Sequence, residues 1–140
     1  MRVRILGCSG GIGGSHLRTT SLLVDDDVLI DAGTGVADLP LAELAKIDHV
    51  FLTHSHLDHI ASLPLLIDSV SDLRDTPLIV HAAAATLRVL AKHIFNWAIW
   101  PDFRVIPSRE QAVMQYRAIR LGQSVRLGLR TITALPAEHT

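Results

Sequence analysis

Short apolar runs at the start of the chain alternate with glycine-rich or acidic turns, which predicts β-strands. Residues 3–7 predict a first strand, and the glycine-rich loop 8–15 follows it. The apolar runs 21–24 and 28–30 are separated by three aspartates, a pattern typical of a β-hairpin with an acidic turn. The first thirty residues are therefore predicted to form antiparallel strands.

Predicted helices and strands alternate in the middle of the chain. In order, they are a helix over 40–46, a strand over 49–52, a loop over 53–59, a helix over 60–70, a strand over 77–80 and a helix over 82–94. Beyond Pro107 the pattern predicts strands again, over 116–121, 124–127 and 129–134. This order predicts an α/β fold with a mixed sheet, in a single domain over residues 1–140.

Composition narrows the class of protein. The chain has 140 residues, of which 49% are hydrophobic, enough to bury a core. The formal net charge of −1 gives no global basic field, so we expect no nucleic-acid partner. The single cysteine, Cys8, suits a reducing compartment and is predicted to be a small buried residue. No signal peptide or membrane span is evident, so a cytoplasmic location is expected.

The segment Thr53–His59, Thr-His-Ser-His-Leu-Asp-His, has the strongest chemical pattern. In an extended chain, side chains two residues apart point the same way, so His54, His56 and Asp58 are predicted to converge while His59 turns to the opposite side. Imidazole nitrogens and a carboxylate are ligands for Zn²⁺, Mn²⁺ or Fe ions. The alternative is a polar loop whose histidines cap the next helix. Isolated histidines such as His81 are predicted to be ordinary surface or hydrogen-bonded core residues.

Four segments resemble metallo-β-lactamase fold hydrolases, and the class II cyclic-nucleotide phosphodiesterases most of all. The metal-binding run His54-x-His56-x-Asp58-His59 carries the superfamily resemblance, and the stretch from Phe95 to Phe103 carries the subgroup resemblance. The similar segments are Leu6-Gly7-Cys8-Ser9-Gly10-Gly11, Leu29-Ile30-Asp31-Ala32-Gly33-Thr34-Gly35, Leu52–Ala61 and His93–Phe103. The resemblance implies an αβ/βα sandwich, of which this chain would supply the N-terminal half and the following strands.

The resemblance also implies a centre of two metal ions, of the zinc type. It assigns His54, His56 and His139 to one metal, and Asp58 and His59 to the other. The implied reaction is hydrolysis of a small phosphodiester, a cyclic nucleotide such as cAMP or cGMP. Two metals would polarise the phosphoryl oxygens and lower the pKa of a water towards about 7, giving a metal-bound hydroxide as nucleophile.

Two aspartates are candidate catalytic residues. Asp58 is expected to bind a metal and to orient the attacking water, so its removal should reduce activity most. Asp31 is a candidate hydrogen-bond partner of a ligand histidine, whose tautomer it would fix. The alternative for Asp31 is an ordinary turn residue at the end of a strand.

The family pattern also contains a bridging aspartate and a last histidine, both further along than Thr140. The chain is therefore expected to be incomplete at its C-terminal end. A half-sandwich would expose one sheet face and a strand edge, so we expect the chain alone to be inactive and to associate, for example as a homodimer. Two other functions stay open: a tRNA 3′-processing nuclease of the same superfamily, and a truncated, non-catalytic metal-binding domain.

Overall fold

The computed structural model describes residues 1–137, in which six strands form one mixed sheet in sequence order. The strands are β1 (Val3–Gly7), β2 (Ser21–Val24), β3 (Val28–Ile30), β4 (His49–Phe51), β5 (Leu78–Ala82) and β6 (Met114–Ala118). The pairs β1–β2 and β2–β3 are antiparallel, whereas β3–β4, β4–β5 and β5–β6 are parallel. A separate antiparallel hairpin consists of β7 (Ser124–Leu127) and β8 (Arg130–Thr133).

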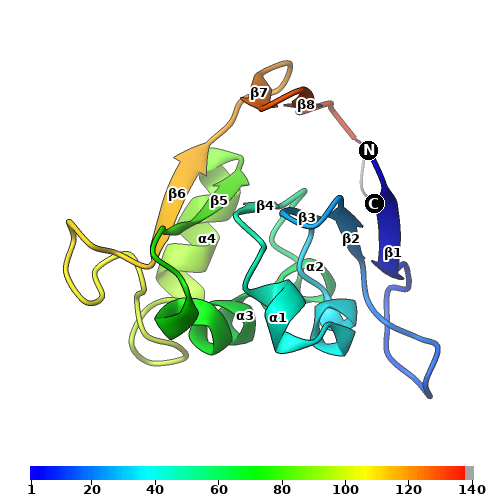
Figure 1. Ribbon diagram of the computed structural model, residues 1–140, viewed down its shortest axis with the longest axis horizontal. Coiled ribbons are helices and arrows are strands. Elements are labelled where there is room, and N and C mark those ends of the chain that lie inside the picture. Colours follow the sequence, from blue (N-terminus) through cyan, green and yellow to red (C-terminus); the bar gives the residue numbers. More distant parts are fainter. Residues whose placement is uncertain (138–140) are drawn as a thin grey trace.

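Helical segments connect the parallel strands. They are η1 (Thr34–Asp38), α1 (Leu41–Leu44), α2 (Leu57–Ile60), α3 (Leu63–Val70), η2 (Ser71–Leu73) and α4 (Ala84–His93), where η denotes a 3₁₀ helix. The α-helices lie on one side of the sheet, and the β7–β8 hairpin lies on the other side (Figure 1). Because parallel strands need such crossover connections, this arrangement follows from the alternation of elements in the sequence.

The main hydrophobic core lies between the sheet and the helices. Leu29, Val50 and Val80 are paired neighbours on β3, β4 and β5, and all three are fully buried in this core. A smaller cluster on the opposite face consists of buried Val24, Val28 and Phe51, against which side chains of the hairpin pack. Both faces of the central strands are therefore apolar, as expected for parallel strands in an α/β fold.

An ion-pair contact attaches the hairpin to the start of the sheet. Arg130 of β8 donates hydrogen bonds of 2.6 Å to both carboxylate oxygens of Asp27, and one of 3.2 Å to Asp25. These aspartates belong to the β2–β3 turn, more than 100 residues earlier. The acidic turn predicted from the sequence is thus the anchor point of the last hairpin.

The predicted mixed α/β sheet and both terminal hairpins are confirmed, but several helix boundaries were wrong. The helix predicted over 60–70 starts at Leu63, whereas Ile60 ends the separate helix α2, because Ala61 and Ser62 form a turn between the two helices. The helix predicted to start at Ala82 starts at Ala84, because Ala82 is the last residue of β5 and pairs with β6. Among residues 1–137, no helix has the length and apolar character needed to cross a membrane.

Candidate metal centre

The candidate site forms at the carboxyl ends of two neighbouring parallel strands. Ile30 of β3 pairs with Phe51 of β4, so the residues that follow these strands leave the sheet side by side. Asp31 follows β3 directly, and the Thr53–His59 segment begins two residues after β4. This edge is where α/β sheets generally place ligand-binding residues.

The histidines of this segment cluster. The ring centroids of His54 and His56 are 4.5 Å apart, and those of His54 and His59 are 4.1 Å apart. The predicted convergence of His54 and His56 is therefore confirmed. The Asp58 Oδ2 atom lies 3.3 Å from the Nε2 atom of His59, which adds a carboxylate beside the imidazoles.

Two details of the predicted geometry were wrong. Asp58 does not continue the extended chain, because α2 begins at Leu57 and includes both Asp58 and His59. For the same reason His59 does not turn to the opposite side: the helical turn brings its ring back against His54. The cluster is thus built from an extended segment and a helical turn.

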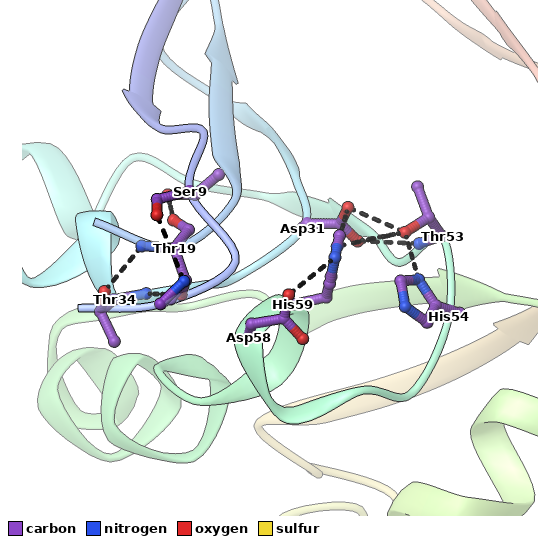
Figure 2. Close-up of polar contacts among 10 residues, drawn as sticks. Ser9, Thr19, Asp31, Thr34, Thr53, His54, Asp58 and His59 are labelled. Carbon is purple, nitrogen blue, oxygen red and sulfur yellow. Dashed lines mark hydrogen bonds and ion pairs between the residues drawn. The ribbon is translucent and has the colours of Figure 1, made fainter. Parts of the chain in front are cut away.

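Asp31 is buried at the base of the cluster, with 2% of its surface exposed. Its Oδ2 atom accepts a hydrogen bond from His59 Nδ1 at 2.7 Å, and its Oδ1 atom accepts one from the Thr53 backbone N–H at 2.8 Å (Figure 2). The predicted hydrogen bond between Asp31 and a histidine of the cluster is present, and its effect on a bound metal stays a prediction. The Asp31 backbone has φ = 56°, a left-handed conformation that aspartate tolerates better than most residues.

Close packing of the backbone holds α2 against the segment that follows β3. The Ala32 N–H donates to the His59 carbonyl oxygen at 2.7 Å. A Cβ atom on Gly33 would lie 2.5 Å from Thr19 Oγ1 and 2.6 Å from the Asp58 carbonyl oxygen. Thr19 and Thr34 also exchange hydrogen bonds, each hydroxyl accepting from the other's backbone N–H at 2.8–2.9 Å (Figure 2). Glycine at position 33 therefore permits the close approach that fixes Asp58.

The chemical types of the side chains in the cluster are those that bind metal ions. Imidazole nitrogens and carboxylate oxygens suit zinc and related transition metals. Within residues 1–137, however, no three His, Cys, Asp or Glu side chains have the geometry of a complete metal site. The predicted ligand His139 lies outside the described residues.

Two further histidines form a separate pair on the sheet face opposite the helices. His81 of β5 is 1% exposed, and its ring stacks on that of Phe51 with the centroids 4.2 Å apart. The Nε2 atom of His81 lies 3.1 Å from the Nδ1 atom of His49. Burial, together with the neighbouring His49 and Arg117, lowers the pKa of His81 to about 4. Burial also lowers the pKa of His49. His81 is therefore a neutral core histidine, as predicted.

Two residues near the site differ from what the sequence indicated. Cys8 is exposed, not buried, because it lies in the glycine-rich loop after β1. Thr53 was not singled out, although its hydroxyl lies 2.9 Å from Asp31 Oδ2 and 3.0 Å from His54 Nδ1. The sequence offered no direct signal for this role, because Thr53 reaches Asp31 only through the parallel pairing of β3 with β4.

Comparison with known proteins identifies relatives of the chain. It is 29% identical to a probable 3′,5′-cyclic-nucleotide phosphodiesterase of Yersinia pestis, over 96% of this chain and 46% of that protein. It is 27% identical to a ribonuclease Z of Bradyrhizobium diazoefficiens, over 96% of this chain and 44% of that protein. The chain thus spans less than half the length of both relatives.

The fold and the family are shared with solved and classified proteins. The metallo-beta-lactamase fold protein YhfI of Bacillus subtilis superposes with a TM-score of 0.65 at 23% identity, over 94% of this chain and 51% of that one. Residues 26–140 match the family described as the beta-lactamase superfamily domain. The chain therefore has the metallo-β-lactamase fold and belongs to the beta-lactamase superfamily.

Proposed function

We propose that this chain is the metal-binding part of a hydrolase that cleaves cyclic-nucleotide phosphodiester bonds. The observation that carries the proposal is the cluster of His54, His56 and His59 with Asp58, anchored by buried Asp31 at the strand ends. The similarity to the Yersinia phosphodiesterase supports the choice of substrate class. The stretch Phe95–Phe103, which resembles the same subgroup, supports it as well.

His54, His56, Asp58 and His59 would hold the metal ions, with His139 as a further ligand. Zinc is the metal we favour, with manganese or iron as alternatives, because imidazole and carboxylate donors accept all three. When bound, such ions supply Lewis-acid polarisation of the phosphoryl group and make water more acidic.

The two aspartates of the site have different proposed roles. Asp31 accepts the Nδ1–H of His59, which leaves Nε2 of that ring as its metal-facing nitrogen and restricts the rotation of the ring. The side chain of Asp58 is 30% exposed, so its carboxylate is accessible to a water molecule as well as to His59. We infer that Asp58 orients the attacking water by accepting a hydrogen bond from it.

A second candidate is cleavage of precursor tRNA. The similarity to a ribonuclease Z over 96% of the chain favours it. The same donor cluster would serve, since both reactions hydrolyse a phosphodiester bond. The net charge of −1 argues against it, because RNA binding generally requires a basic surface.

A substrate comparison separates the two candidates. The complete product of the reading frame that encodes this chain is loaded with zinc or manganese and is given cyclic AMP, cyclic GMP or precursor tRNA. We expect hydrolysis of the cyclic nucleotides, and the matched variant Asp58→Asn should lose it. Cleavage of precursor tRNA without hydrolysis of cyclic nucleotides would select the ribonuclease function. Retention of no metal by the wild-type protein would refute both.

A further inference from the structure

The Thr53 hydroxyl lies at the centre of a polar network between β3, β4 and α2. Its Oγ1 atom is 2.9 Å from Asp31 Oδ2 and 3.1 Å from Asp31 Oδ1. It is also 3.0 Å from His54 Nδ1 and 3.4 Å from His59 Nδ1 (Figure 2). One hydroxyl group thus joins the buried carboxylate to both rings.

Counting protons assigns a direction to each of these hydrogen bonds. A hydroxyl group has one hydrogen to donate, and an ionised carboxylate only accepts. The Asp31 carboxylate already accepts from the Thr53 backbone N–H and from His59 Nδ1. The Thr53 hydroxyl therefore donates to Asp31, and its lone pairs accept from the Nδ1–H of His54.

The tautomers of both rings follow from this assignment. A neutral imidazole carries one N–H, so a ring that donates from Nδ1 has its lone pair on Nε2. We propose that Thr53 is a positioning residue. By donating a hydrogen bond to Asp31 and accepting one from His54, it fixes His54 as the Nδ1–H tautomer, whereas Asp31 fixes the tautomer of His59 directly. Both rings then present Nε2 as the donor nitrogen.

The proposal rests on the proposed function only for the identity of the metal ligands. The proton positions are a property of the metal-free chain and are tested there. Thr53→Val removes the hydroxyl group and nearly preserves the shape of the side chain. The Thr53 backbone N–H, which binds Asp31 separately, remains. Thr53→Ser, which restores the hydroxyl group, is the matched control.

The first experiment measures tautomers directly. The 140-residue chain is labelled with ¹⁵N-histidine, and long-range ¹H–¹⁵N spectra are recorded without metal at about pH 8, above the ordinary histidine pKa of about 6.5. We expect His54 and His59 as Nδ1–H tautomers in the wild type. In Thr53→Val, His54 should become a mixture while His59 keeps its tautomer, and Thr53→Ser should restore the wild-type spectrum. An unchanged His54 in Thr53→Val, or no restoration by serine, would overturn the proposal.

The second experiment measures zinc affinity by calorimetry for the same three proteins. Loss of an outer hydrogen-bond partner typically weakens metal binding about 10–100-fold, and we expect about 10-fold for Thr53→Val with recovery in Thr53→Ser. If the wild type shows the expected tautomers but binds no zinc, the proposed function fails and the assignment of protons to Thr53 stands. If Thr53→Val does not fold, Thr53→Ala removes the hydroxyl group without a branched side chain and replaces it.

Discussion

Lowering the pH from 7 towards 4 is expected to destabilise the fold through His81, a residue outside the candidate metal centre. His81 is 1% exposed on β5, and burial beside His49 and Arg117 lowers its pKa to about 4. The folded protein therefore keeps this ring neutral at a pH at which the unfolded chain already protonates it. The perturbation that tests this is His81→Phe, which removes the titrating group and keeps an aromatic ring against Phe51.

The magnitude follows from the difference between the two pKa values of His81. Because the folded pKa is depressed below the ordinary value of 6.5, the stabilisation is complete above pH 6.5 and is lost as the pH falls to about 4. At about 1.4 kcal/mol per pH unit, the loss amounts to about 3 kcal/mol in the free energy of unfolding. That is a large part of the stability of a typical domain.

Urea denaturation at a series of pH values measures this loss. We expect the free energy of unfolding to fall steeply below pH 6.5 in the wild type and to fall by about 3 kcal/mol less in His81→Phe. His93→Phe, at an exposed position at the end of α4, is the matched control and should keep the wild-type slope. Parallel pH curves for wild type and His81→Phe would refute the reasoning.

Further predictions concern the site and its scaffold. Asp31→Asn should reduce zinc affinity about 10–100-fold, and Asp58→Asn should reduce phosphodiester hydrolysis by more than that, as titration calorimetry and steady-state kinetics would show. Gly33→Ala should lower the free energy of unfolding by about 1–3 kcal/mol, because its Cβ would lie 2.5 Å from Thr19 Oγ1. Gly10→Ala is the control for this variant. A Cβ atom on Gly10 would have no atom within 4 Å apart from those of its chain neighbours, so the free energy of unfolding measured in urea should change by no more than about 0.5 kcal/mol.

The central part of the sheet could be predicted from the sequence because β2, β3 and β5 are largely apolar runs bounded by turn residues. The hairpin of β2 and β3 was evident from three aspartates between two such runs, and β4 from the β-rich residues before the histidines. The order of β3, β4, β5 and β6 in the sheet, and their parallel pairing, were not predicted, because they depend on how the helices cross between strands. That pairing brings Asp31 beside Thr53.

The details of the cluster were harder to predict because the start of α2 has no clear signal. His56, which precedes the helix, makes no side-chain capping hydrogen bond, so the usual serine, threonine or aspartate mark is missing. Asp58 in the first turn was the one hint, since acidic residues are favoured there. Alternation along an extended chain was the simpler interpretation of the segment, and that interpretation placed the His59 ring on the wrong side.

The attachment of the β7–β8 hairpin has a consequence for local opening. The hairpin contacts the rest of the fold through the Arg130 ion pairs and a small apolar cluster, whereas β4 and β5 are paired on both sides within the sheet. Segments with few buried contacts open below the free energy of global unfolding. Amide hydrogens of β7 and β8 should therefore exchange with solvent faster than those of β4 and β5. Added salt should widen that difference by screening Arg130 from its aspartates.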